Sequence, residues 1–210
     1  MEPVVIVVGA VAEALAWAVV VRGRRNIWRT LLPVLGLMGA AALITGSVRT
    51  SPRVALAAAA AVGVVAGGVL YVATRVFVNA VRGWAAFQRQ SVETYERRGT
   101  LSLPIALLLS VGVSALGEEL FWRGLVQPEL SRAVDGRVLG ATLSYLAFVA
   151  VNLPSANLAI LAGAVAGGAV WTILGWWSGG FLASVCCHGA WTALMLGFPV
   201  VRRDGDRVGP

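Results

Sequence analysis

Residues 101–126 read LSLPIALLLSVGVSALGEELFWRGLV, and this stretch decides the fold class. It is apolar over the length that a membrane-spanning helix requires, which is about 20 residues. Near its end, however, it carries Glu118, Glu119 and Arg123. A charged side chain at the centre of a membrane helix costs about 2.5–3.5 kcal/mol on insertion scales, so such a cluster requires a structural or chemical reason. The stretch therefore predicts a transmembrane helix that carries a polar cluster.

The rest of the chain has the same apolar character. Of its 210 residues, 58% are hydrophobic and only 13% are charged, and the mean hydropathy is +0.80. These values exclude a soluble globular enzyme, a disordered tail and a fibrous repeat. Six further apolar runs cover residues 3–21, 31–48, 54–78, 138–153, 158–177 and 181–201. Only helices and closed barrels satisfy the backbone in lipid, and these runs are too uniformly apolar for barrel strands. We expect an all-α polytopic bundle of about seven transmembrane helices in the cell membrane.

Four segments follow from this pattern. Residues 1–78 should form three N-terminal transmembrane helices, residues 79–99 an interfacial amphipathic linker, residues 100–201 a four-helix core, and residues 202–210 a charged tail. The linker combines arginines and glutamates with apolar residues at helical spacing, namely Val81, Trp84, Ala85, Val92 and Tyr95. That pattern predicts a helix lying along the membrane surface. The alternative is a solvated linker.

Arginine supplies all of the basic charge. The net charge is +7, and each of the 17 basic residues is an arginine. Because the arginines lie between apolar runs, they indicate membrane topology and contact with lipid headgroups rather than nucleic-acid binding. The first cluster, from Arg22 to Arg29, follows the first run, whereas a cleaved signal peptide has the opposite order, so we expect a retained helix. The loop after the first helix, the linker and the tail should be cytoplasmic, with the N-terminus outside and Glu118 toward the outer half of the membrane.

Small residues and cysteines give weaker signals. The pairs Gly63/Gly67, Gly163/Gly167 and Gly175/Gly179 have the four-residue spacing that lets two membrane helices approach closely. Such pairs also arise by chance in a chain rich in alanine and glycine. Cys186 and Cys187 are adjacent on a helix and point about 100° apart, so we expect no disulfide between them.

The polar residues inside the apolar runs are the candidate functional residues. Glu119 and Arg123 are four residues apart and can pair on one helix face. Glu118 points about 100° away and has no partner in its own turn, so it is the candidate general base. The alternative is a purely structural cluster that reaches the membrane surface.

Four more polar residues lie on other helices. Asn152 follows Phe148 by one turn, and His188, the only histidine, precedes Thr192 by one turn. A lone histidine among apolar residues is more often a hydrogen-bonded core residue than a catalyst. Glu13 stands alone in the first run, and we interpret it as a protonated or snorkelling carboxyl group without a role in the chemistry.

These residues together resemble the motifs of the CPBP family, which comprises CAAX prenyl endopeptidases and bacteriocin-processing, abortive-infection-type membrane proteins. Glu118, Glu119 and Arg123 resemble its first motif, Glu-Glu-x-x-x-Arg. The segments FVAVN at residues 148–152 and HGAWT at residues 188–192 resemble its second motif, Phe-x-x-x-His, and its third, His-x-x-x-Asn or Asp. The order and spacing agree over residues 101–201. The resemblance implies that the last four helices form a CPBP-type core.

The resemblance also implies an activity and roles for residues. It implies a metal-independent glutamic intramembrane endopeptidase without a cofactor, which cleaves a membrane-associated peptide or protein. Glu118 would activate water, His188 would donate to the oxyanion, and Glu119 with Arg123 would brace the site. Asn152 and Thr192 stand where the family has catalytic His and Asn, and Phe148 begins the second motif.

Two departures keep a second function open. Asparagine cannot hold a proton near neutral pH, and its presence in place of histidine removes roughly 10²–10⁴-fold in rate. Threonine keeps one donor where the family has Asn. A catalytically impaired member that binds a membrane partner, as an immunity or scaffold protein, is the alternative; a small transporter would need a polar path that the first three helices do not offer.

The sequence also bears on the metal, the source and the substrate. A metal site is the weaker interpretation of the polar residues, because Cys186, Cys187 and His188 fan around their helix and Glu119 is expected to pair with Arg123. The abundance of alanine, glycine and arginine, without lysine, indicates a bacterial source of high genomic GC content. We therefore expect a substrate other than a prenylated protein.

Overall fold

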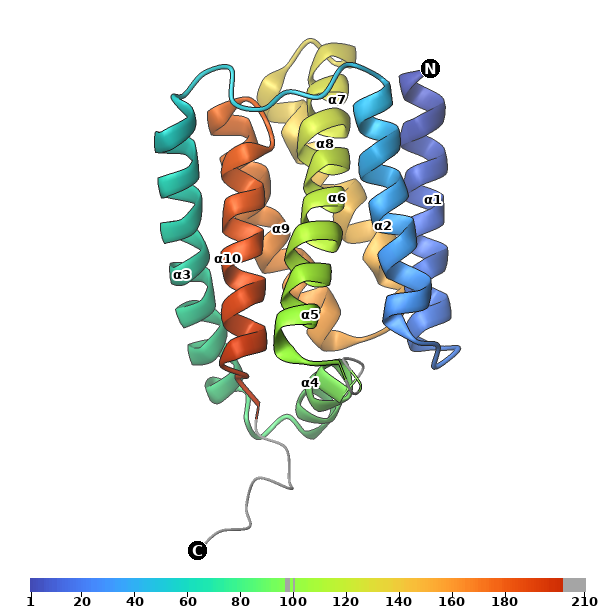
Figure 1. Cartoon of the computed structure of the whole chain (residues 1–210), viewed down its shortest axis with the longest axis vertical. Helices are drawn as coiled ribbons and strands as arrows, with labels where there is room; N and C mark the ends of the chain where they lie inside the picture. Colours follow the sequence, from blue (N-terminus) through green and yellow to red (C-terminus); the bar gives the residue numbers. More distant parts are fainter. Residues whose placement is uncertain (97–98, 100, 202–210) are drawn as a thin grey trace, which may run out of the picture.

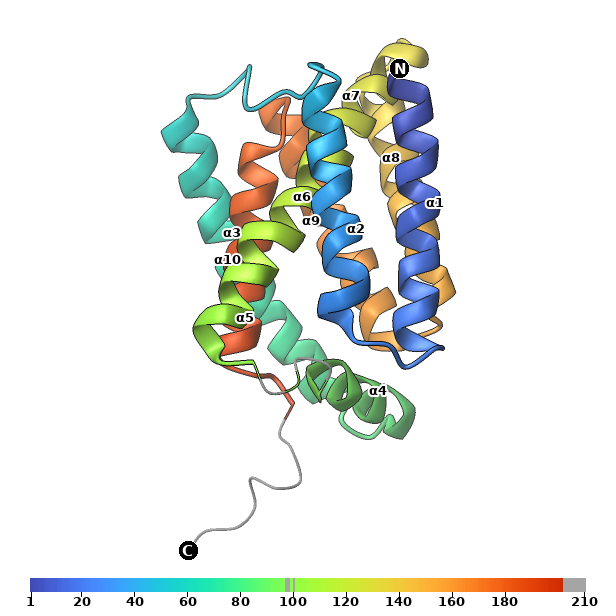
Figure 2. The same ribbon diagram turned by 45° about the vertical axis from the view of Figure 1, so that its right-hand side comes forward.

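The protein is an all-helical bundle in the computed structural model, which describes residues 1–96, 99 and 101–201. The described residues form eight continuous helices, most of which run roughly parallel to one long axis (Figures 1 and 2). Their segments are α1 (Glu2–Val21), α2 (Ile27–Ile44), α3 (Leu56–Ala80), α4 (Ala85–Glu96), α5 (Leu103–Leu109), η1 (Ser110–Ala115), α6 (Leu116–Glu119), η2 (Leu120–Val126), α7 (Gln127–Ala133), α8 (Arg137–Asn152), η3 (Leu153–Ser155), α9 (Leu158–Ser178) and α10 (Leu182–Gly197). The segments from α5 to α7 are one unbroken helix.

Six of these helices are long and apolar enough to cross a membrane, so the protein is a multi-pass membrane protein. The spans are Glu2–Val21, Ile27–Ile44, Leu56–Ala80, Leu103–Ala133, Arg137–Ser155 and Leu158–Ser178. The seventh predicted crossing corresponds to α10, which is apolar but has 16 residues. At 1.5 Å per residue that is about 24 Å, somewhat short of a bilayer core. Large apolar side chains such as Val7, Val64 and Leu108 are exposed, as a lipid-facing surface requires.

Several of the predicted helices differ in their ends. The second run was expected at residues 31–48, but α2 begins at Ile27 because the Asn26 side chain caps it, accepting hydrogen bonds from the backbone N–H groups of Trp28 (2.9 Å) and Arg29 (3.3 Å). The fourth run was expected to end at residue 126, but the helix continues to Ala133. The added segment, α7, is polar and so lies outside the apolar run, and its first residue, Gln127, is buried against α9.

One of the three glycine pairs brings two helices together. A Cβ atom at Gly67 would lie 2.6 Å from the backbone oxygen of Cys187, and one at Gly63 would overlap the backbone of Ala183, so α3 packs directly on α10. Gly167 instead faces its own helix's Trp171, and Gly179 ends α9 in a left-handed conformation (φ 79°). The structure therefore supports the close-approach interpretation for both members of Gly63/Gly67. In the third pair it supports this interpretation for Gly175, where a Cβ atom would lie 3.0 Å from Arg123 Cγ.

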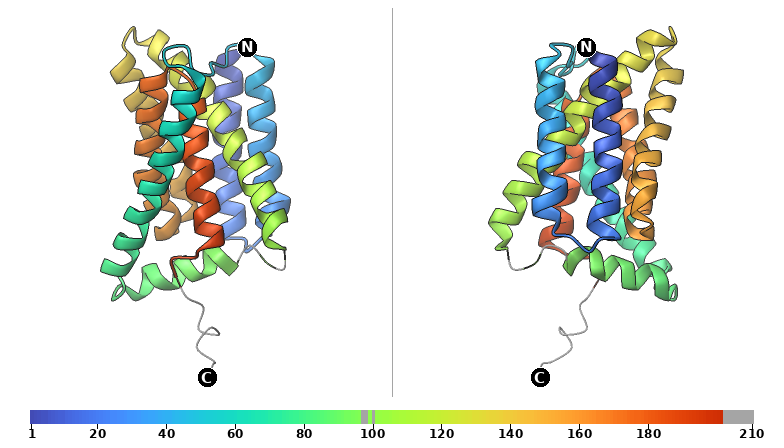
Figure 3. Two further views of the ribbon diagram at one scale, coloured as in Figure 1. Left: turned by 60° about the vertical axis from the view of Figure 1, so that its left-hand side comes forward. Right: turned by 90° about the vertical axis from the view of Figure 1, so that its right-hand side faces the viewer.

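The helix α4 lies across one end of the bundle, at a steep angle to the long helices (Figure 3). The α1–α2 connection and the end of α10 lie at this same end, and the N-terminus lies at the other. Phe87 and Ser91 form the buried face of α4, with Val92 and Tyr95 half-buried, whereas Trp84 and Ala85 of the predicted apolar face are exposed. The predicted linker residues Arg97 and Arg98 and the predicted charged tail lie outside the described residues.

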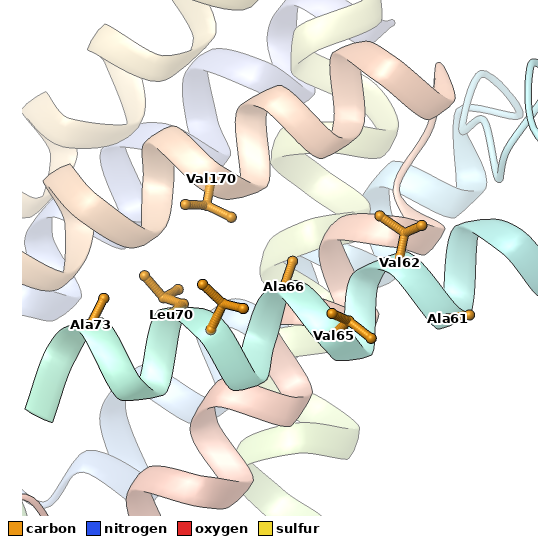
Figure 4. Close-up of a pocket in the computed structure, with 8 residues that line it drawn as sticks. Ala61, Val62, Val65, Ala66, Leu70, Ala73 and Val170 are labelled. Atoms are coloured by element: carbon orange, nitrogen blue, oxygen red, sulfur yellow. The ribbon is translucent and has the colours of Figure 1, made fainter.

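An open groove of about 590 Å³ runs between α3 and α9 (Figure 4). Residues of α3 from Ala61 to Ala73 line it, and Val170 of α9 closes it. All of the lining residues are alanine, valine or leucine. The groove therefore suits a hydrocarbon chain and contains none of the candidate catalytic side chains.

Candidate active site

The acidic pair Glu118–Glu119 lies between two π-helical segments. The α-helical turn α6 (Leu116–Glu119) is flanked by η1 and η2, both of which have the wider π-helical winding. Such π segments are rare and are frequently found at functional sites. Gly117 precedes the pair, and a Cβ atom there would collide with the backbone of Leu35, so α2 presses directly against α6. Both features direct the two carboxyl groups into the bundle.

Glu119 and Arg123 form the predicted ion pair in the interior. Arg123 Nη1 lies 3.2 Å from Glu119 Oε1, and the two side chains are 1% and 0% exposed. Arg123 Nη2 donates to the backbone oxygen of Gly168 (3.2 Å) and to Thr172 Oγ1 (3.4 Å). The guanidinium group also lies 4.4 Å from the ring centroid of Phe148. The positive charge is therefore neutralised and hydrogen-bonded on three sides, as a buried charge requires.

His188 of α10 is held against both glutamates. Its Nδ1 atom lies 3.0 Å from Glu119 Oε1 and 3.8 Å from Glu118 Oε2. The imidazole ring stacks on Trp171 of α9, with a centroid distance of 3.8 Å and an interplanar angle of 16°. Because an ionised carboxylate only accepts hydrogen bonds, Nδ1 carries a hydrogen toward Glu119, which leaves Nε2 for another partner.

Glu118 meets a carboxyl group from the first helix. Glu118 is buried, with 7% of its surface exposed, and the carboxyl group of Glu13 lies within its hydrogen-bonding reach. Glu13 is fully buried, and its Oε2 accepts a hydrogen bond of 2.8 Å from Trp122 Nε1. Of the two alternatives expected for Glu13, snorkelling to the surface is therefore wrong, because Glu13 is fully buried and the indole of Trp122 holds it in the interior, whereas protonation stays a prediction.

Two of the predicted site residues are not tied to this cluster. Asn152 is buried, but its side-chain Nδ2 donates to the backbone oxygen of Phe148 (2.9 Å) within its own helix. Thr192 is half-buried. Across the described part of the chain, neither side chain makes a hydrogen bond to Glu118, Glu119 or His188. The structure thus brings together Glu118, Glu119, Arg123, Phe148 and His188.

Sequence reasoning missed several residues that build the site. Trp171 and Thr172 lie on α9, which contributes none of the quoted motifs, and Gln127 Nε2 donates to the Thr172 backbone oxygen (3.2 Å). The available signal was that Trp171 and Thr172 interrupt a run that is aliphatic or glycine over residues 158–170. Glu13 is the single charged residue of the first apolar run, and the sequence gives no indication that Trp122, 109 positions away, is its partner.

The site does not assemble a set of metal ligands. Among the described residues, no group of three His, Cys, Asp or Glu side chains is placed to hold a metal ion. Cys186 and Cys187 are free thiols on α10. The polar groups of the cluster are one histidine, three carboxyl groups and one arginine, and the arginine is paired with Glu119. Imidazole and carboxyl groups are suited to proton transfer.

Comparison with known families places this cluster within one domain. A family described as type II CAAX prenyl endopeptidase Rce1-like matches residues 100–194. Residues 100–194 therefore form a domain of the Rce1-like type II CAAX prenyl endopeptidase (CPBP) family. Glu118, Glu119, Arg123, Phe148 and His188 all lie inside the matched residues, whereas Glu13 lies outside them. Neither the comparison with curated proteins nor that with solved structures gives a match.

Proposed function

We propose that this protein is an intramembrane endopeptidase that hydrolyses a peptide bond of a membrane-associated peptide or protein, with Glu118 as the general base. The observation that carries the proposal is the buried cluster in which His188 Nδ1 lies 3.0 Å from Glu119 and 3.8 Å from Glu118 within an endopeptidase family domain. A buried ionisable cluster is costly in a membrane protein and indicates function.

The chemistry requires one water molecule and the Glu118 carboxylate. Glu118 takes a proton from the water as the water oxygen bonds to the carbonyl carbon of the substrate. The tetrahedral intermediate then collapses, the C–N bond breaks, and Glu118 returns the proton to the leaving amine nitrogen. Water and peptide bond are consumed, a carboxyl group and an amine are produced, and Glu118 is restored.

His188 and Thr192 stabilise the oxyanion in this proposal. His188 directs its Nδ1–H to Glu119 and donates from Nε2 to the developing negative charge. Losing one such donor costs about 10²–10³-fold in rate. Glu119 and Arg123 fix the histidine, and Phe148 packs on the guanidinium face of Arg123. Asn152 would serve as a hydrogen-bond donor or acceptor to the water.

One observation favours the second candidate, a partner-binding protein without catalysis. The Asn152 amide donates to its own helix rather than toward Glu118. An asparagine cannot hold a proton near neutral pH, so the site lacks the second proton acceptor that the histidine of the family's second motif supplies. The domain would then bind a membrane protein without cleaving it.

The test compares new protein N-termini in the membranes of host cells that express the wild type or the Glu118→Gln variant at equal levels. Glutamine preserves the size of the side chain and removes the base. New N-termini that appear only with the wild type are expected, and they name the substrates. Identical profiles would refute the protease and leave the binding function, for which cross-linking in the membrane would identify the partner.

A further inference from the structure

The carboxyl group of Glu13 lies in the middle of α1 and faces the site rather than the lipid. It is fully buried on the same face of the helix as Gly9, Ala16 and Val20. This helix precedes the family domain by about 80 residues of sequence and packs against the domain through α8, η2 and η3. A carboxyl group in such a place is not accounted for by the family match.

The polar neighbours of the Glu13 carboxyl group are two indole groups and the carboxyl group of Glu118. Trp122 Nε1 donates to its Oε2 at 2.8 Å. The Glu118 carboxyl group and the Trp17 indole are its other polar neighbours, and the charge of Arg123 acts on both carboxyl groups. Glu119 also acts on Glu118, but Glu119 is already bound by Arg123 and His188. Arg123 is committed to Glu119, so no separate cation stands between Glu13 and Glu118 in the described residues.

Two ionised carboxylates cannot bond to each other, because both only accept hydrogen bonds. Oε1 of Glu13 is buried and accepts no hydrogen bond. A buried acceptor left unpaired costs about 1–3 kcal/mol, and more for a charged group. One proton on either carboxyl group removes both costs, since it gives an O–H donor directed at the other group and halves the negative charge of the pair. Glu13 is the better holder of this proton, because it is fully buried, whereas Glu118 is 7% exposed and lies 3.8 Å from His188 Nδ1, where a negative charge is better stabilised.

We propose that Glu13 is a positioning residue that donates a hydrogen bond from its protonated carboxyl group to the Glu118 carboxylate. The proposal deepens the function above and rests on it for its catalytic meaning, but the carboxyl pair itself is a property of the resting protein. Glu13 orients the Glu118 oxygen that faces water. It also provides, from outside the family domain, a second acidic group in a site where Asn152 replaces histidine.

The test is infrared difference spectroscopy of the purified full-length protein in lipid vesicles at neutral pH. A protonated carboxyl group has its own C=O stretching band. The wild type should show such a band, and Glu13→Gln should abolish it. Glu118→Gln should shift it, because the acid then faces an amide instead of a carboxylate. Glu2→Gln, a carboxyl group at the start of the same helix that bonds to Ser47, is the matched control and should leave the band unchanged.

Three results would overturn the proposal: no protonated band in the wild type, a band that survives Glu13→Gln, or a band unmoved by Glu118→Gln. The last would mean that Glu13 is an isolated buried acid. If a Gln variant does not fold, Trp122→Phe keeps an aromatic ring and removes the N–H donor to Glu13, and it should shift the band as well. The spectrum requires no substrate, so its failure is distinguishable from a failure to detect proteolysis.

Discussion

Removing Arg123 should destabilise the protein strongly, because Arg123 neutralises a carboxylate that has no access to solvent. Arg123 and Glu119 are 1% and 0% exposed, and Arg123 also supplies donors to Gly168 and Thr172. Deleting one partner of a buried ion pair costs about 3–5 kcal/mol, since the other charge is left uncompensated. Arg123→Met, which keeps the aliphatic volume, should therefore lower the free energy of unfolding by at least about 3 kcal/mol.

The double variant Glu119→Gln/Arg123→Met separates the ion pair from simple packing. Removing both charges of a buried pair is often close to neutral, so the double variant should be more stable than Arg123→Met alone. The coupling free energy between the two positions should lie near the upper end of the usual range of about 0.5–3 kcal/mol. His188 would still find an acceptor in the amide oxygen that Glu119→Gln introduces.

Unfolding free energies measured in lipid bicelles by steric trapping would test this. The control is Arg132→Met, which removes an arginine that pairs with Glu129 at the protein surface, where its side chain is 53% exposed. Surface pairs contribute about 0–1 kcal/mol, so this variant should be almost neutral. Losses for Arg123→Met no larger than those for Arg132→Met would refute the argument, as would a double variant that shows the sum of both single losses.

Three further predictions concern other parts of the structure. Gly117→Ala should cost about 1–3 kcal/mol by overpacking α2 against α6 and should lower cleavage, whereas Gly68→Ala, which has open space around it, should do neither in the same unfolding and N-terminus assays. Burial raises the pKa of Tyr95 on α4 to about 12. The unfolded chain loses that proton first, near pH 10, so stability should fall as the pH rises between about 10 and 12, and Tyr95→Phe should remove this loss in unfolding experiments across that range. Asn152→His should raise a weak cleavage activity, measured as the yield of wild-type N-termini; an unchanged yield would contradict the assignment of this position to the second motif.

The fold class could be predicted from the sequence because lipid restricts the alternatives. Long apolar runs in a chain without soluble-domain composition permit only membrane helices, and each of the seven runs became a helix. The ends could not be predicted where a polar group acts locally. Asn26 starts α2 four residues early by capping it, and α10 is shorter than its apolar run because the chain turns away from the helix after Gly197.

The local part of the site could be predicted and the long-range part could not. The spacing of Glu119 and Arg123 on one helix determined their pairing, and the motif order indicated that His188 would join them. The position of Glu13 depends on which face of α1 packs on the domain, and the Trp122 indole fixes that face through one hydrogen bond. Trp171 stacks on His188 from a helix whose sequence carries no motif, so only the packing of α9 against α10 reveals it.

The arrangement of the helices is compatible with the predicted membrane topology. The α1–α2 connection and α4 lie at one end of the bundle, as the arginine distribution requires (Figure 1). Which end faces the cytoplasm, and therefore which face the substrate approaches, follows from the positive-inside argument alone. Accessibility of a cysteine introduced at Arg24 to a membrane-impermeant thiol reagent would establish it.

The most direct test of the central claim is cleavage by the purified protein. Wild-type and Glu118→Gln proteins, reconstituted separately in lipid vesicles, would be mixed with a membrane protein whose new N-terminus appears in cells only with the wild type. We predict that the wild type produces the same N-terminus in vitro and that Glu118→Gln produces none. Cleavage by both proteins would exclude Glu118 as the base, and cleavage by neither would assign the cellular product to another protease and this chain to partner binding.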